Sequence, residues 1–111
     1  MKNYRKRIAD DILMRKLEGK GAVLIEGPKW CGKTTTAEQL AASILYMDDP
    51  EKKAQNITMS ELNPKRLLKG ATPRLIDEWQ LAPKLWDAIR FEVDHRGELG
   101  QFLLTGTAVR A

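Results

Sequence analysis

Two glycines, a lysine and a threonine stand at fixed spacing in the stretch "LIEGPKWCGKTTTA", residues 24–37. The pattern G-x-x-x-x-G-K-[ST] is met by Gly27, Gly32, Lys33 and Thr34. Gly27 allows the chain to leave the preceding apolar segment at a sharp angle, and Gly32 lets backbone N–H groups approach an anion with no Cβ in the way. Lys33 adds a mobile cation. These residue types at this spacing predict a loop that binds phosphate groups.

The segments on either side of this loop are a predicted strand and a predicted helix, as a phosphate-binding loop requires. "AVLIE", residues 22–26, is a short continuous apolar run, as expected of a strand that is buried on both faces of a parallel sheet. Strong helix formers follow over residues 33–42, so the positive end of a helix would point at the same anion. The Thr34 hydroxyl would then hold Mg²⁺, a hard ion that prefers oxygen ligands.

An acidic pair, Asp77 and Glu78, ends a second apolar segment, "RLIDE" at residues 74–78. A Mg²⁺ ion held by one threonine needs a carboxylate as well, and Asp77 is placed to supply it. Phosphoryl transfer depends mainly on positioning and charge stabilisation, so a carboxylate aimed at an attacking water, here Glu78, indicates hydrolysis. The alternative interpretation is a solvated acidic pair that merely ends a strand.

A threonine ends the last strand candidate, "QFLLTGT" at residues 101–107. If this strand lies between those at 22–26 and 74–78, Thr105 would emerge beside the terminal phosphate and could hydrogen-bond to it or to the water. Ordinary packing and turn formation at a strand end would also explain a threonine here.

Strands and helices are predicted to alternate along the chain. Such alternation favours right-handed crossovers and a parallel three-layer α/β fold. One weak helix candidate, "SELNPKRLLKG", would be capped by Ser60 and closed by Gly70. The full expected order is helix 3–18, strand 22–26, helix 33–42, strand 43–49, helix 60–70, strand 74–78, helix 81–94 and strand 101–107.

Composition sets further limits on the class of protein. A chain of 111 residues is the size of a single domain, and its net charge of +4 is modest. The basic excess lies in the first 20 residues, with seven basic and three acidic side chains, and could contact nucleic acid or an acidic partner or form a solvated helix face. A single cysteine, Cys31, excludes an intrachain disulfide, and no stretch of about 18 apolar residues predicts a membrane span. We therefore expect a cytoplasmic protein.

In this order, the phosphate loop, the Asp-Glu strand and the Thr-ended strand resemble P-loop ATPases of the additional-strand, catalytic-glutamate group. The stretches "LIEGPKWCGKTTTAEQLA", "PRLIDEWQLAPKLWDAIRFEVDHRG" and "FLLTGTA" are most similar to the AAA-type module of predicted prokaryotic ATPases with an uncharacterised C-terminal region. The resemblance implies a P-loop NTPase fold with the strand at 101–107 between those at 22–26 and 74–78, in the order 1-4-3-2. It also implies ATP as the nucleotide, Asp77 and Glu78 as the Walker B pair and Thr105 as sensor 1. The implied nucleotide-binding residues are Gly27, Pro28, Lys29, Trp30, Cys31, Gly32, Lys33, Thr34 and Thr35.

The sequence departs from this family at its end. The family continues to a fifth strand, an arginine finger and further domains, so we expect residues 1–111 to be the N-terminal portion of such a domain. The strand at 22–26 would then be a sheet edge, and an unpaired edge favours association with a second chain. Without an arginine finger, ATP hydrolysis in this portion would be weak or absent, because such a finger supplies orders of magnitude in rate.

Three functions remain open at this point. The first is Mg²⁺-dependent ATP hydrolysis, with Glu78, Lys33 and Thr105 as catalytic residues and Thr34 and Asp77 as metal ligands. The second is a P-loop kinase acting on a small molecule, although no arginine-rich segment follows the helix at 81–94. The third is a nucleotide-gated module that binds nucleic acid or a partner through Lys2, Arg5, Lys6 and Arg7.

Overall fold

The computed structural model describes residues 13–16, 21–27, 33–98 and 100–107 of the chain. Among the described helices, none is long and apolar enough to cross a membrane. The elements are β1 (Leu13–Lys16), β2 (Ala22–Gly27), α2 (Lys33–Leu40), β3 (Ser43–Tyr46), α3 (Lys53–Leu62), α4 (Pro64–Leu67), β4 (Arg74–Asp77), the 3-10 turn η1 (Trp79–Leu81), α5 (Lys84–Arg96) and β5 (Phe102–Thr107).

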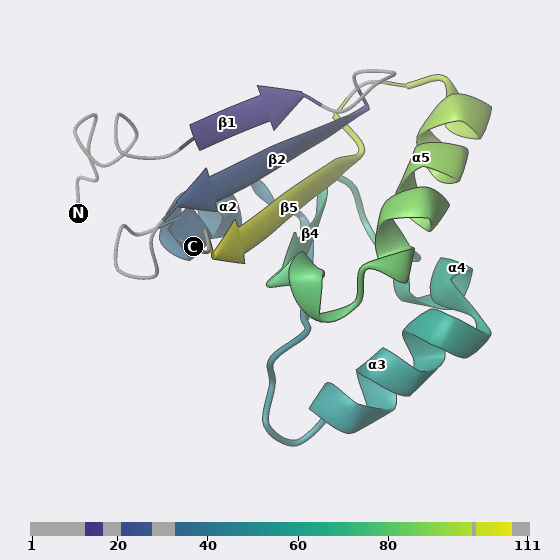
Figure 1. Ribbon diagram of the computed structural model, residues 1–111. Helices are drawn as coiled ribbons and strands as arrows, with labels where there is room; N and C mark the ends of the chain where they lie inside the picture. Colours follow the sequence, from purple (N-terminus) through teal and green to yellow (C-terminus); the bar gives the residue numbers. More distant parts are fainter. Residues whose placement is uncertain (1–12, 17–20, 28–32, 99, 108–111) are drawn as a thin grey trace.

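The sheet has the order β1-β2-β5-β4-β3 (Figure 1). The pairs β2–β5, β5–β4 and β4–β3 are parallel, so the last strand in sequence lies between the strand before the phosphate loop and the strand that ends in Asp77. This confirms the expected α/β fold and the order of its four parallel strands. The carboxyl ends of these strands therefore meet at one edge of the sheet.

The N-terminal segment differs from the expectation. The predicted helix over 3–18 is wrong at Leu13–Lys16, which forms β1 and pairs antiparallel with β2, from Leu13 opposite Glu26 to Lys16 opposite Val23. The outer edge of β2 carries backbone N–H and C=O groups that need partners, and this pairing outweighs a modest helical propensity. Because β1 pairs with its outer edge, β2 is not an edge strand, and it offers no unpaired edge to a second chain.

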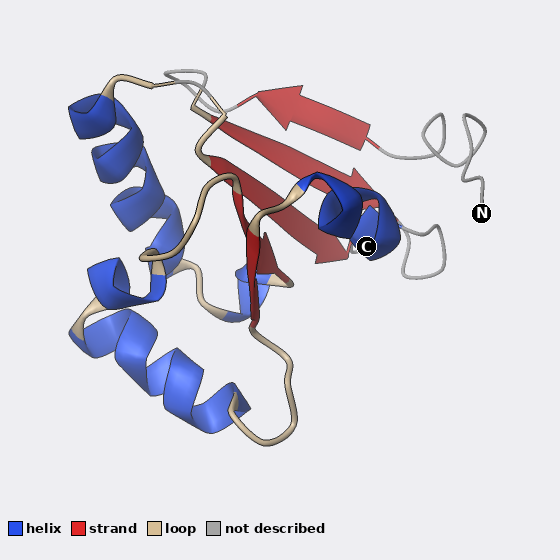
Figure 2. Cartoon of the chain, turned by 180° about the vertical axis from the view of Figure 1, so that it is seen from behind, coloured by secondary structure: helices blue, strands red, loops and turns tan. Residues whose placement is uncertain are grey.

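Two apolar clusters cover the two faces of the sheet, which gives the predicted three layers (Figure 2). The side chains alternate along each strand, so neighbours in sequence such as Leu103 and Leu104 enter different clusters. On the α2 face, the buried residues are Ile25, Ala37, Leu75 and Leu103. On the other face, α4 and α5 pack over a larger cluster that includes Leu24, Ile76, Leu85, Ile89, Phe102 and Leu104.

The helices between β3 and β4 also differ from the expectation. Ser60 is not a cap: it lies inside α3, is buried, and donates its hydroxyl to the Ile57 carbonyl at 2.6 Å. Pro64 begins the separate helix α4, because proline restricts the residue before it to non-helical conformations and so separates the two helices at Asn63. Gly70 follows α4 with a φ of +154°, in a loop and not at a helix end.

The helix expected from Leu81 begins at Lys84, after η1.

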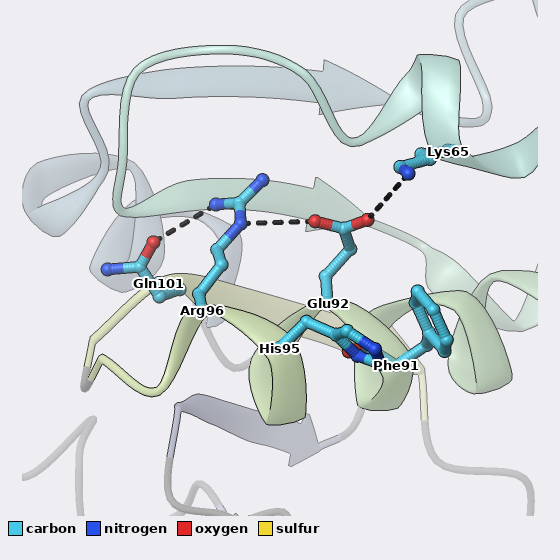
Figure 3. A network of polar contacts seen from close by, with 6 residues as sticks. All are labelled: Lys65, Phe91, Glu92, His95, Arg96 and Gln101. Carbon is cyan, nitrogen blue, oxygen red and sulfur yellow. Dashed lines mark hydrogen bonds and ion pairs between the residues drawn. The ribbon is translucent and has the colours of Figure 1, made fainter.

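A polar network holds α4 and α5 against the start of β5 (Figure 3). Arg96 donates from Nε to Glu92 Oε1 at 3.2 Å and from a terminal nitrogen to Gln101 Oε1 at 3.0 Å. Its guanidinium also lies 5.1 Å from the centre of the Phe102 ring, where a cation is attracted to the π face. Glu92 is buried and faces Lys65 of α4 at 3.8 Å. The network therefore fixes the layer of helices opposite α2.

Candidate nucleotide-binding site

The site is built where β2 gives way to α2. β2 ends at Gly27 and α2 begins at Lys33, so the predicted strand and the predicted helix lie on either side of residues 28–32. Thr35 is exposed in the first turn of α2. The predicted ligands Pro28, Lys29, Trp30, Cys31 and Gly32 lie outside the described residues, as do the side chains of Lys33 and Thr34.

Asp77, Thr105 and Glu78 form a hydrogen-bonded chain at the carboxyl ends of β4 and β5. The Thr105 hydroxyl donates to Asp77 Oδ1 at 2.6 Å and accepts the Glu78 backbone N–H at 3.4 Å. Asp77 is 5% exposed and Thr105 is 0% exposed, so this polar contact is buried, and its loss would remove a hydrogen bond from the interior of the fold. The structure therefore brings Thr105 together with the Asp77–Glu78 pair, which the sequence placed on a different strand.

Asp77 and Thr105 face the side of the sheet that carries α2. Asp77 is the register partner of Thr105, which in turn is opposite Ile25. Because alternate residues share a face, Asp77 lies on the side of Leu75, which packs in the cluster with Ala37 of α2. With strands about 4.8 Å apart, Asp77 is about 10 Å from β2 across β5. The acidic residue thus faces the layer formed by α2.

Glu78 has an unusual backbone conformation. Its φ of 59° and ψ of 51° are left-handed, which is uncommon for a residue with a side chain and is often found at functional sites. Its Oε1 accepts a hydrogen bond from Gln80 Nε2 at 2.6 Å, and the side chain is half-buried. The turn therefore directs Glu78 away from the strand while Gln80 holds its carboxylate.

Tyr46 and Glu38 link β3 to α2 beside Asp77, and sequence analysis did not identify either of them. Tyr46 is the register partner of Asp77, and its hydroxyl donates to Glu38 Oε2. That hydrogen bond, with a smaller contribution from burial and from the charges of Glu38 and Asp77, raises the pKa of Tyr46 to about 12. The Tyr46 phenol is therefore protonated at neutral pH and can donate this hydrogen bond. Only the strand register could have indicated this contact.

Two buried polar atoms lie around Gly106. Trp79 Nε1 and Gln80 Oε1 have no hydrogen-bond partner in the described part of the chain. A Cβ on Gly106 would lie 2.9 Å from each of these atoms, so only glycine allows the turn after β4 to approach β5 this closely. Trp79 also packs against Trp86, with ring centres 5.0 Å apart. Gly106 and the tryptophan pair therefore fix the segment that carries Glu78.

The oxygen donors at this site fit a hard cation. Asp77 offers a buried carboxylate on the α2 face of the sheet, and Thr34 would add a hydroxyl from the first turn of α2. Carboxylate and hydroxyl oxygens are the ligands that Mg²⁺ prefers, and Mg²⁺ usually binds through few protein ligands together with substrate phosphates. Within the described residues, no cluster of three or more His, Cys, Asp and Glu side chains offers a metal site made by protein alone.

Comparison with known proteins assigns the chain to a family. The AAA domain family matches residues 19–110, which covers the strand before the phosphate loop, the Asp77–Glu78 segment and Thr105. Comparison with curated proteins gave no match, and comparison with solved structures gave none either. The chain belongs to the AAA domain family and is a nucleotide-binding, ATPase-like module.

Proposed function

We propose that this module binds ATP with Mg²⁺ and hydrolyses it at a low rate. In this proposal, the loop amides from Gly27 to Thr35 and the Lys33 ammonium hold the phosphates. Thr34 and Asp77 are the metal ligands, and Glu78 is the general base. Bound Mg²⁺ would supply charge stabilisation on the phosphate oxygens.

The observation that carries the proposal is the hydrogen-bonded chain of Asp77, Thr105 and Glu78 on the α2 face of the sheet. A metal ligand and a general base must be held at different points, one near the cation and the other near the attacking water. The backbone adopts a left-handed conformation at Glu78, directly after the strand that ends in Asp77. Solvated acidic residues at a strand end would require neither the burial of Asp77 nor this turn.

Each remaining residue has a defined task in this mechanism. Thr105 fixes Asp77 by donating a hydrogen bond, and it holds the Glu78 backbone by accepting one. Gln80 orients the Glu78 carboxylate through its amide. Glu78 would accept a proton from a water molecule as that water attacks the terminal phosphate. Direct attack by water also separates this proposal from a kinase, which would need an acceptor molecule.

The first prediction concerns Glu78→Gln. Because glutamine cannot accept the proton, phosphate release should fall by roughly 100- to 10,000-fold, as is usual for loss of a general base. Binding of Mg-ATP should stay within about threefold of the parent, because Glu78 does not hold the phosphates in this mechanism. The measurements are phosphate release without any added acceptor and equilibrium titration with ATP.

The matched control is Glu61→Gln, which makes the same change at an exposed position of α3. This control should release phosphate at the parent's rate. Phosphate release by Glu78→Gln at the parent's rate would show that Glu78 is not the base.

A further inference from the structure

A basic pocket lies at the junction of α3 and α4, and the nucleotide-binding proposal does not use it. The pocket has a volume of about 570 Å³ and is lined by Asn63, Lys65, Arg66 and Lys69. None of the described residues that line it is acidic, apolar or aromatic. In Figure 1, α4 lies on the right of the molecule, whereas the carboxyl ends of β2 and β5 lie on the left. The pocket is therefore separate from the nucleotide site.

The charge around this pocket is concentrated and mostly unpaired. From Asn63 to Ile76 the sequence has four basic residues and no acidic one. Lys65 has a 3.8 Å ion pair with Glu92, but its side chain is 65% exposed, so this pair contributes little to holding it (Figure 3). Arg66 and Lys69 are exposed and have no ion pair within the described residues. Two cations thus face the pocket without a carboxylate partner.

The fourth basic residue, Arg74, holds the pocket wall in place. Its Nε donates to the Leu67 carbonyl at 2.9 Å, and a terminal nitrogen donates to Ser43 Oγ at 3.1 Å. Leu67 and Leu68 are buried, so α4 is anchored to the core on one side while its basic residues stay exposed on the other. The cations are therefore displayed from a fixed backbone, which lowers the entropic cost of binding a ligand.

We propose that this pocket binds backbone phosphates of a nucleic acid. Phosphate oxygens in such complexes are contacted mainly by Arg, Lys and amide side chains, which are the residue types present here. A protein partner would be expected to find apolar or aromatic anchors, and the described lining residues supply none. Without side chains that stack on bases, recognition depends on charge and is independent of nucleotide sequence.

The test is a salt-dependent titration of the chain with a short labelled DNA duplex. For a duplex, the slope of log affinity against log salt is roughly 0.9 per phosphate contact. The variant Arg66→Glu/Lys69→Glu should therefore bind the duplex at least tenfold more weakly than the parent. The magnitude of its slope should be smaller by about two. Two duplexes of unrelated sequence should give equal affinities.

Three controls make the result specific. The variant Lys52→Glu/Lys53→Glu has the same change in net charge at the far end of α3 and should lose much less affinity. The milder variant Arg66→Ala/Lys69→Ala should show an intermediate loss. Stabilisation by Mg-ATP should be unchanged in all three variants, which separates this site from the nucleotide site.

Several results would overturn the proposal. These are failure of the parent to bind DNA, equal losses in the α3 and pocket charge reversals, and displacement of DNA by polyglutamate as effectively as by unlabelled duplex. The last result would indicate a general acidic partner and not a phosphate backbone.

Discussion

At the scale of single residues, Thr105 makes the contacts on which the site depends. Its hydroxyl uses one hydrogen to bind Asp77 and one lone pair to accept the Glu78 N–H, so a single side chain positions both acidic residues. The side chain is completely buried, and its hydrogen bond to Asp77 is buried as well. Thr105 therefore acts as a structural link between β5 and β4.

We predict that Thr105→Val lowers the free energy of unfolding by about 1–3 kcal/mol, because valine keeps the shape but removes the hydrogen bonds to the buried Asp77 carboxylate and to the Glu78 N–H. Chemical unfolding measures this value. The matched control is Thr58→Val on the exposed surface of α3, which should change stability by less than about 0.5 kcal/mol. Equal stability of the two variants would show that the Thr105 hydroxyl contributes nothing.

Sequence spacing could identify Asp77, Glu78 and Thr105 because each stands at the end of an apolar segment. It could not identify Gln80 or Tyr46, since their roles come from a turn conformation and from strand register. The left-handed conformation of Glu78 also has no sequence signal, because the residue is neither glycine nor asparagine.

At the scale of elements, the contact between Tyr46 and Glu38 ties the edge strand β3 to α2. The same helix begins at the phosphate loop, so this contact helps to fix the direction in which the helix start points. The hydrogen bond requires a protonated Tyr46 phenol, so the stability that this bond contributes depends on pH.

We predict that the stabilisation contributed by Tyr46 is complete below pH 10.0 and is lost as the pH rises toward about 12. The pKa is higher in the folded state than in the unfolded state, so the folded protein binds more protons in this window and its stability falls as pH rises. The measurement is the difference in unfolding free energy between the parent and Tyr46→Phe as a function of pH. This difference should shrink across the window. A difference that stays constant would contradict the assignment.

Elements were predictable where apolar runs and helical spacing were strong. The four parallel strands follow from such runs, and the helical spacing of Leu85 and Ile89 matches the buried face of α5. β1 could not be predicted, because a strand of four residues is defined by its pairing with β2 and not by its own composition. α3 was mostly missed, since its asparagine, threonine and serine residues favour helices weakly and Asn56 and Ser60 are buried polar residues.

At the scale of the whole molecule, the two candidate sites lie on opposite sides of the sheet. The α2 face carries the contacts around Asp77, and the opposite layer carries the basic pocket beside α4. The strand β5 lies in the middle of the sheet and packs on both layers through Leu103 and Leu104.

The central claim is that the segment from Gly27 to Thr35 binds ATP, and thermal stabilisation by Mg-ATP tests it most directly. A ligand at about 100 times its Kd stabilises the folded state by roughly 2.7 kcal/mol, so the parent's unfolding temperature should rise by several degrees. The rise should be larger with Mg-ATP than with Mg-GTP. Lys33→Ala should largely abolish it, while the control Lys84→Ala, at an exposed position in the first turn of α5, should retain it. Equal stabilisation of the parent and Lys33→Ala would contradict the account.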